Sequence, residues 1–322
     1  MYEKFAVTKT FGIEGNDGFE VMGFEDATHP KIPVPKADYQ FRKDQLMFLL
    51  LFLTRPTGDG LYVFGPHGSG KTSLVAQAAA RLNWPVHQVT CTGRMELNDL
   101  VGRFDLVDGS MRYVHGSLAQ AVRDGHILML NEADLMDPSE LAGLNDILEG
   151  SPLEIPQNGG EVIKPHPMFR VVATANSNGF GDDTGMYQGA KMMNQAFMDR
   201  FRLLKVGYMA DDEETRLLSH RLAAMGIPNA ANLGPLLGNM VAVANEVRRL
   251  FAGGGDGVGE LRATMSHRVL FRWVNIFLSY RRMPNGLEYS LDCALTQRVD
   301  PAEREAIHRI AKNVFGDSWG VA

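Results

Sequence analysis

The feature that most constrains this chain is an eight-residue stretch, Gly65-Pro66-His67-Gly68-Ser69-Gly70-Lys71-Thr72. The apolar run Leu61–Phe64 precedes it and is typical of a buried strand, and a helical pattern of apolar residues from Leu74 to Leu82 follows it. Glycines at these positions let successive backbone N–H groups turn inward on an anion, and the helix N-terminus adds partial positive charge. The pattern therefore predicts a loop that binds the phosphates of a nucleoside triphosphate, which we expect to be ATP.

Two side chains of this loop carry specific chemistry. Lys71 is expected to reach the β- and γ-phosphates, and Thr72 to offer its hydroxyl to Mg²⁺. We interpret His67 as a spacer in the loop, of which the main chain and not the imidazole contributes to phosphate binding. The predicted nucleotide-binding residues are Gly65, Pro66, His67, Gly68, Ser69, Gly70, Lys71, Thr72 and Ser73.

Four further apolar runs alternate with helical patterns along the chain, namely Val86–Thr90, Ile127–Leu130, Arg170–Thr174 and Leu203–Val206. Strands that alternate with helices predict a parallel sheet covered by helices on both faces. From about Asp211 onward only helical spacing remains. We therefore expect an N-terminal arm or small appendage over residues 1–38, an α/β domain over residues 39–207, and a smaller all-helical domain over residues 208–322.

The formal net charge of −6 argues against binding to nucleic acid through bulk electrostatics. The pairs Arg248-Arg249 and Arg281-Arg282 are candidates for a local basic patch. We favour the alternative that both pairs lie near helix C-termini and face water, where cations suit the helix dipole.

Targeting and redox features favour the cytoplasm. The cysteines Cys91 and Cys293 lie far apart and show no metal-ligand spacing, which is typical of a reducing compartment. The N-terminus lacks the pattern of a signal peptide, and the longest apolar run, Leu46–Leu53, is too short for a membrane span. We expect a cytoplasmic protein without a membrane partner.

A polar pair, Asn131-Glu132, ends the apolar run Ile127–Leu130. ATPases with a phosphate-binding loop need an acidic residue on a neighbouring strand, and Glu132 is the predicted base that orients the attacking water. Asn131 stands where Asp is usual, and its amide can accept a hydrogen bond from a metal-bound water but brings no charge. We predict that Thr72 and Asn131 form the magnesium site, with weaker Mg²⁺–ATP binding or slower turnover.

Three more side chains are candidates for the catalytic site. Asn176 follows the next strand and is predicted to contact the γ-phosphate or the water, the alternative being a local turn. Arg200 lies in Met198-Asp199-Arg200-Phe201 and is predicted to reach a neighbouring subunit's nucleotide, the alternative being a surface ion pair with Asp199. Arg268 is predicted to fold back onto the phosphates of its own subunit.

The order of loop, acidic strand, sensor Asn, M-D-R-F and late Arg resembles the AAA+ ATPases, and within them the MoxR group. Two segments look like the hairpins inserted in that group. The first is Gly93–Ser117, and the second is Leu153–Ile163, which turns at Asn158-Gly159-Gly160.

A closer resemblance is to the ATPase subunits of aerobic cobaltochelatases, the CobS type. It departs from that type at Asn131. The segments that carry it are Thr10–Ile13, Ala80–Pro85, Lys164–Arg170, Ala173–Asn176, Gly181–Tyr187, Asn194–Arg200 and Met265–Arg268.

The resemblance implies a homo-oligomeric ring, commonly a hexamer, in which Arg200 stabilises charge on a neighbour's γ-phosphate. It implies an ATP-hydrolysing motor that remodels a partner, with a von Willebrand A-type protein and a large chelatase subunit as partners in metal insertion into a tetrapyrrole. The alternatives are a MoxR-like activator of another client and a scaffold that assembles on ATP with weak hydrolysis because of Asn131. A DNA-linked motor is disfavoured by the acidic balance.

Overall fold

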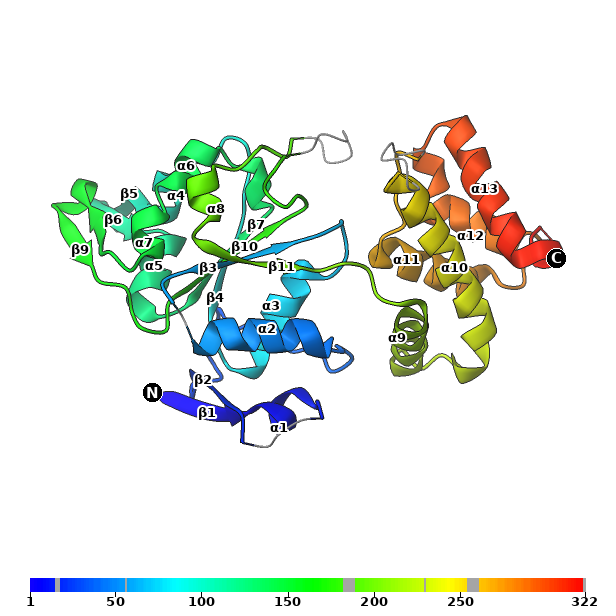
Figure 1. Cartoon of the computed structure of the whole chain (residues 1–322), viewed down its shortest axis with the longest axis horizontal. Coiled ribbons are helices and arrows are strands. Elements are labelled where there is room, and N and C mark those ends of the chain that lie inside the picture. The colour runs from blue at the N-terminus through cyan, green and yellow to red at the C-terminus, as the bar shows by residue number, and fades with distance from the viewer. Residues whose placement is uncertain (15–17, 56, 182–188, 229, 254–260, 321–322) are drawn as a thin grey trace. The chain divides into compact units, whose positions relative to one another are not determined.

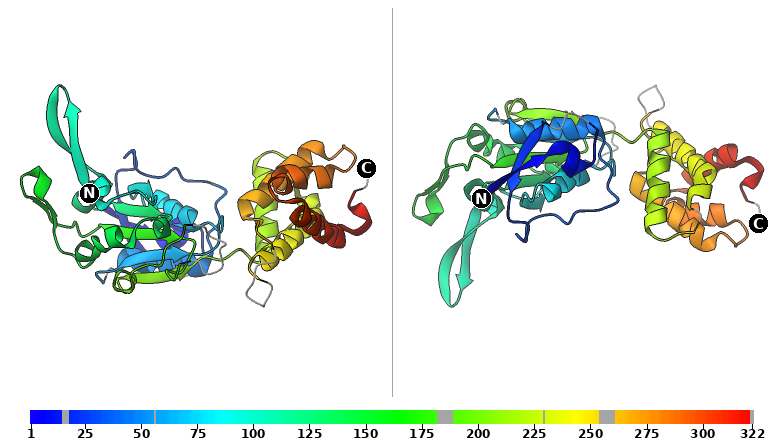
Figure 2. Two further views of the ribbon diagram at one scale, coloured as in Figure 1. Left: turned by 90° about the horizontal axis from the view of Figure 1, so that it is seen from above. Right: turned by 90° about the horizontal axis from the view of Figure 1, so that it is seen from below.

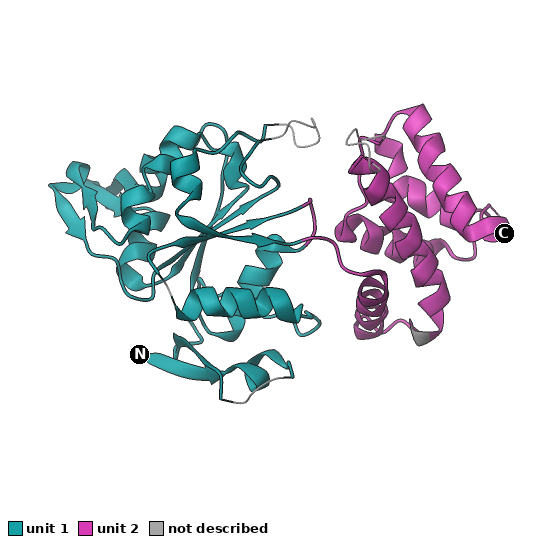
Figure 3. Ribbon diagram, viewed as in Figure 1, with its two compact units in different colours: residues 1–65, 70–183, 187–206 teal, residues 66–69, 184–186, 207–322 magenta. Residues whose placement is uncertain are grey.

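The computed structural model of the protein describes residues 1–14, 18–55, 57–181, 189–228, 230–253 and 261–320 (Figure 1). The chain forms two compact units (Figure 3). Unit 1 holds most of the chain up to Val206, and unit 2 holds the chain from Gly207 together with Pro66–Ser69. The resemblance segment Gly181–Tyr187 lies, apart from Gly181, outside the described residues.

Unit 1 is built on a five-stranded parallel sheet whose strand order is β11-β3-β10-β7-β4. All five strands predicted from the apolar runs are present, each within two residues of its expected bounds, which confirms the α/β class. They are β3 (Gly60–Phe64), β4 (Val86–Thr90), β7 (Ile127–Asn131), β10 (Arg170–Ala175) and β11 (Phe201–Lys205).

Both faces of this sheet are buried under hydrophobic clusters, and successive side chains of a strand point into one cluster and then the other. Leu61 and Val63 of β3 join one hydrophobic cluster with the helices α2 (Lys43–Thr54) and α3 (Lys71–Arg81). Tyr62, between them, joins the cluster on the other face. A strand buried on both sides is a nearly continuous apolar run, so the apolar runs of the sequence predict these strands.

The helices of the second face are short; four of them flank the inserted hairpins, and the last precedes β11 (Figure 1). They are α4 (Leu97–Val101), α5 (Ser117–Asp124), α6 (Pro138–Ala142), α7 (Asn145–Leu148) and α8 (Gln195–Met198).

The N-terminal residues, expected to form an arm or small appendage, share the core of unit 1. The strands β1 (Tyr2–Ala6) and β2 (Glu20–Phe24) pair antiparallel around α1 (Val7–Phe11). Val7, Phe11 and Val21 are buried in the cluster that contains α2 and α3.

Two antiparallel hairpins are present where they were expected. The hairpin of β5 (Gly102–Val107) and β6 (Ser110–His115) projects from the body of unit 1 (Figure 2). Its turn residues Asp108 and Gly109 have φ values of 50° and 77°, as a tight two-residue hairpin turn requires. The second hairpin joins β8 (Leu153–Ile155) to β9 (Glu161–Ile163).

Unit 2 is helical in its described part and has its own core around Trp273, Leu270 and Val247. Among the described residues of this unit, the helices of nine or more residues are α9 (Asp211–Ala224), α10 (Gly234–Phe251), α11 (His267–Tyr280), α12 (Gly286–Ala294) and α13 (Pro301–Phe315). Within the described ranges, no helix has both the length and the apolar character that crossing a bilayer requires.

Candidate active site

The glycine-rich loop leaves β3 at Phe64 and enters α3 at Lys71. Gly65 has a φ of 148°, and a Cβ there would lie 2.1 Å from the carbonyl oxygen of Val206. Gly70, at the N-cap of α3, has a φ of 100°. Because side chains are excluded at these points, the backbone can fold into the tight turn that phosphate-binding loops use around an anion.

Lys71 lies at the centre of the site. Its Nζ donates to the carbonyl oxygen of Gly65 at 2.7 Å and to Oδ1 of Asn176 at 3.0 Å. Burial lowers the pKa of Lys71 to about 8, although the charges of Asp134 and Glu132 act in the opposite direction. A buried ammonium at the end of a glycine-rich loop is well suited to bind phosphate.

Asn131 ends β7 beside the loop, as predicted, and makes two contacts there. Its Oδ1 accepts from the Thr72 hydroxyl at 2.9 Å and from the Thr174 hydroxyl at 3.1 Å. Its Nδ2 is buried and has no partner among the residues that the structure describes.

The donor set around Asn131 fits a magnesium ion that takes most of its ligands from water and phosphate. Thr72 and Asn131 supply oxygen atoms, which Mg²⁺ prefers, but both are neutral. No group of three or more His, Cys, Asp or Glu side chains suited to a metal occurs in the described part of the chain. The negative charge for such an ion would therefore come from the nucleotide.

Glu132 follows β7 directly and adopts a left-handed conformation, with a φ of 54° and a ψ of 44°. This conformation is unfavourable for a non-glycine residue and marks positions that the surrounding structure holds in place. The Glu132 side chain is exposed at the end of the strand. An exposed carboxylate beside the phosphate-binding loop has the access to water that a general base needs.

Asp134 was not predicted, and it organises the end of β10. Its buried Oδ2 accepts from the backbone N–H groups of Asn176 at 2.9 Å and Ser177 at 3.1 Å. These bonds hold the backbone from which the Asn176 side chain reaches Lys71. The only signal in the sequence was an acidic residue two positions after Glu132, in Asn-Glu-Ala-Asp.

Arg200 lies at the other end of the sheet. Its carbonyl oxygen accepts from the N–H of Gly60, and the next residue, Phe201, is in register with Gly60 at the start of β3. The phosphate-binding loop begins after Phe64, so the length of β3, about 13 Å, separates the two points. Within this unit, Arg200 is directed to a different edge from Lys71.

The contacts of the two neighbouring arginines differ. Nη2 of Arg200 lies 2.5 Å from Oε1 of Glu149, so its ion pair is with Glu149 and not with Asp199. Arg202, two residues further on, pairs with Asp59 at 2.5 Å and donates to the carbonyl oxygen of Arg55. Arg202 thus fastens the turn before β3.

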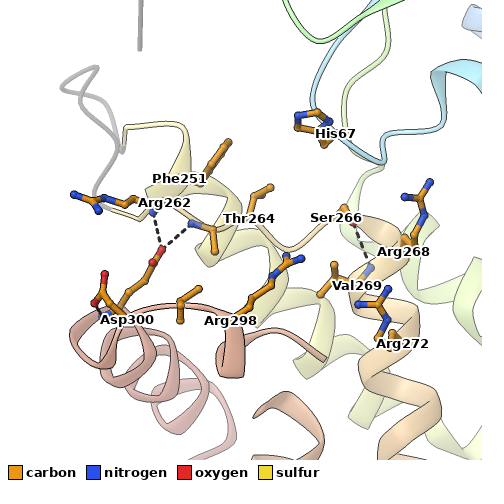
Figure 4. A pocket seen from close by; sticks show the side chains of 13 residues that line it. His67, Phe251, Arg262, Thr264, Ser266, Arg268, Val269, Arg272, Arg298 and Asp300 are labelled. Carbon is orange, nitrogen blue, oxygen red and sulfur yellow. Dashed lines mark hydrogen bonds between the residues drawn. The ribbon is translucent and has the colours of Figure 1, made fainter. Parts of the chain in front are cut away.

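Arg268 lies in the first turn of α11, in unit 2, where it is exposed (Figure 4). It lines a pocket of about 720 Å³ together with three other arginines, Arg262, Arg272 and Arg298, and with His67. Within the described residues, none of these four guanidinium groups forms an ion pair. The main chain of His67 also has a partner in unit 2, since its carbonyl oxygen accepts from the Tyr208 hydroxyl at 2.9 Å.

The interpretation of Arg248 as a solvated cation was wrong. Arg248 is only 6% exposed and forms two hydrogen bonds to the buried carboxylate of Glu214, at 2.6 and 2.9 Å. Its guanidinium also lies over the ring of Tyr208, 4.1 Å from the centroid. Helical spacing showed that Arg248 is near a helix end, but the partner lies 34 residues away in sequence and only the folded unit brings it close.

Comparison with known proteins agrees with this geometry. Residues 60–201 match the AAA domain of the dynein-related subfamily, and residues 234–314 match the C-terminal domain of the CbbQ/NirQ/NorQ proteins. The chain belongs to the MoxR-type AAA+ ATPases. In this MoxR-type ATPase the first match covers the loop, Glu132, Asn176 and Arg200, and the second covers α11 with Arg268.

Named relatives of this ATPase span several kinds of protein. The aerobic cobaltochelatase subunit CobS of a Sinorhizobium species is 28% identical over 97% of this chain and 90% of its own length. An uncharacterised protein of Staphylococcus haemolyticus is 33% identical over 46% of this chain and 55% of its own. Midasin of Dictyostelium discoideum is 30% identical over 70% of this chain, which corresponds to 4% of midasin.

Proposed function

We propose that this MoxR-type ATPase acts as a ring, most simply a hexamer, that hydrolyses Mg²⁺–ATP between subunits and uses the energy to remodel a partner protein. The observation that supports this proposal is the position of Arg200, which lies a strand length away from the loop of its own subunit. An arginine at that edge can complete the site of an adjacent subunit.

The roles at one such site follow from the contacts of each residue. Gly65–Ser73 would hold the phosphates, with Lys71 as the positive charge on them. Glu132 would orient the attacking water and accept its proton, while Asn176, held by Asp134 and bonded to Lys71, would contact the γ-phosphate or the water.

Thr72 and Asn131 would hold the magnesium ion, which when bound neutralises charge on the phosphate oxygens. Arg268 would contribute a further positive charge to the phosphates of its own subunit. Arg200 would enter from the neighbouring subunit and stabilise charge on the γ-phosphate.

The steady-state ATPase rate, measured over a range of protein concentrations, tests the motor. An arginine supplied in trans contributes about 10³–10⁵ in rate, so activity per subunit should rise steeply as rings form. Glu132→Gln and Arg200→Ala should each remove most of it, whereas Arg202→Ala should mainly lower stability because Arg202 fastens a turn. Full activity in Arg200→Ala would exclude Arg200 as the trans residue, and a wild type no faster than Glu132→Gln would exclude the motor.

A second candidate function is an ATP-dependent scaffold with weak hydrolysis. The observation in its favour is Asn131, a neutral residue with an unpaired buried Nδ2 at the proposed magnesium site. A scaffold would form rings whose nucleotide sites are fully occupied by ATP. Its ATPase rate would then be the same in the wild type and in Glu132→Gln.

We further propose that the partner is a von Willebrand A-type protein together with a client. The similarity to CobS makes a tetrapyrrole chelatase the first client to test, and a MoxR-like activation of another metalloenzyme the second. The β5–β6 hairpin offers a contact surface, since Phe104, Leu106 and Met111 expose 51%, 68% and 64% of their surface. We also propose that the protein acts in the cytoplasm, where ATP is available and free cysteines such as Cys91 and Cys293 remain reduced.

ATP-dependent cobalt insertion into a corrin, assayed with the purified candidate subunits from neighbouring genes, tests the client. Wild-type activity combined with a loss in Glu132→Gln would support the chelatase. ATP-dependent activation of a different metalloenzyme, without cobalt insertion, would support the second client.

A further inference from the structure

Glu149 and Arg200 form an ion pair that joins the end of one helix to the residue before a strand. Glu149 is the C-cap of α7, and Arg200 lies between α8 and β11. The Glu149 side chain is 53% exposed, and the Arg200 side chain is 26% exposed. A carboxylate at a helix C-terminus gains nothing from the helix dipole, so local helix preference does not account for glutamate here.

The direction in which the Arg200 guanidinium points depends on its contact with Glu149. Nη1 donates to the carbonyl oxygen of Ala196, and Nη2 pairs with Glu149. Nε is buried and has no partner within the described part of the chain. Without Glu149, the guanidinium would keep one hydrogen bond to the backbone, and the long side chain would regain most of its freedom.

We propose that Glu149 is a positioning residue that orients the Arg200 guanidinium for the nucleotide site of the adjacent subunit. This inference rests on the proposed role of Arg200 in trans. A side chain that is ordered before the reaction loses no further conformational freedom in the transition state, and misplacement of a reacting group by about 1 Å costs about 10²-fold in rate. The exposed carboxylate is screened by water, so the pair is weak enough for Arg200 to turn toward a phosphate.

Mixed rings separate positioning from a structural role. One parent is Glu132→Gln, which keeps Arg200 but lacks the base, and the other is Arg200→Ala, which keeps Glu132 but lacks the arginine. Each should lose most of its activity alone, and mixing should restore sites where the first parent offers Arg200 to the second. Glu149→Gln is then placed in one parent at a time, with mixing of subunits checked by native mass spectrometry.

In the parent that donates Arg200, Glu149→Gln should lower kcat about tenfold or more and change KM for ATP by less than about twofold. In the other parent it should have little effect, because Arg200 is absent there. Glu149→Asp in the donating parent should restore part of the rate. Asp146→Asn, the same loss of charge on the same helix, is the matched control and should leave the mixture unchanged.

Three results would overturn the proposal. An unchanged rate with Glu149→Gln in the donating parent would show that Arg200 does not depend on it. An equal loss in either parent would show a structural role. Mixed rings that stay inactive without any change at Glu149 would show that Arg200 does not act in trans, and both ideas would then fail while the ATPase activity of the wild type stood.

Discussion

The ammonium of Lys71 donates to Oδ1 of Asn176 at 3.0 Å, and through this bond the loop after β3 is joined to the end of β10. The partner is a neutral amide, so the bond orients Lys71 without neutralising it. Since burial lowers the pKa of Lys71 to about 8, the nucleotide-free protein holds this charge at some cost.

Nucleotide binding should therefore depend on pH. Bound phosphates favour the ammonium form, so the affinity for ATP should fall by up to about tenfold per pH unit above pH 8, with uptake of a proton. Isothermal titration calorimetry in buffers of different ionisation enthalpy measures the affinity for ATP and the number of protons taken up. Lys71→Arg, which stays charged throughout, should bind with a flat profile. An affinity that stays constant from pH 7.5 to 9.5 in the wild type would contradict this account.

The same shift predicts how this group affects stability without nucleotide. Between about pH 8 and the usual pKa of lysine, about 10.4, the unfolded chain binds more protons at Lys71 than the folded chain. The contribution of Lys71 to the free energy of unfolding should therefore rise with pH in this window. Urea denaturation of the wild type and Lys71→Met at pH 7.5 and 10 isolates it, since Lys71→Met should lack that part of the pH dependence.

Asn131→Asp should raise the ATPase rate and lower the Mg²⁺ concentration needed for half-maximal activity. A carboxylate keeps both hydroxyl contacts and places a charged oxygen where Nδ2 has no partner. Without Mg²⁺, the buried charge should lower the free energy of unfolding by about 1–3 kcal/mol. The rate as a function of Mg²⁺ and the thermal midpoint with and without Mg²⁺–ATP are the measurements. No gain in rate would show that Asn131 does not limit turnover.

Asp134 should affect both the stability of the site and the pKa of Lys71. Asp134→Ala leaves two backbone N–H groups without an acceptor, which should cost about 1–3 kcal/mol for each. Asp134→Asn keeps an acceptor and should cost less. Both remove a charge that raises the pKa of Lys71, so in both the pH at which ATP affinity declines should move below 8. Equal stability of the two variants would contradict the assigned hydrogen bonds.

Removing one partner of the buried pair in unit 2 should be strongly destabilising. Burial of Glu214 opposes its ionisation, but Arg248 and His267 outweigh burial and hold its pKa below the usual range. Arg248→Met should lower the free energy of unfolding by about 3–5 kcal/mol, measured by urea denaturation. Arg249→Met, next to it on α10 and paired with Glu246 at the surface, is the control and should cost at most about 1 kcal/mol.

The pH dependence of this pair has a definite sign. Because the folded pKa of Glu214 is lowered, its contribution to stability is complete above the usual pKa of glutamate and declines as pH falls through the folded value. In Arg248→Met, burial is opposed by His267 alone, so the folded variant protonates Glu214 at a higher pH than the wild type does, and the difference in stability should shrink as the pH falls through that range. A difference that stays constant down to acidic pH would place the cause elsewhere.

The sequence by itself determined the strands, the phosphate-binding loop and the order of the two units. A strand buried on both faces is a continuous apolar run, and the loop needs glycines at fixed spacing because only they allow its backbone. These are local requirements, so the strand at Leu61–Phe64 and the loop at Gly65–Thr72 can be predicted from the sequence alone.

Only the tertiary structure decided which polar groups meet. Asp134 reaches the backbone of Asn176 because β7 and β10 are adjacent in the sheet, an order that nothing in either run specifies. Arg248 meets Glu214, and Arg200 meets Glu149, across 34 and 51 positions of sequence. Such pairings depend on how whole helices and strands pack against one another. The periodicity of a sequence predicts whether a residue is buried, but it does not predict which distant residue will contact it.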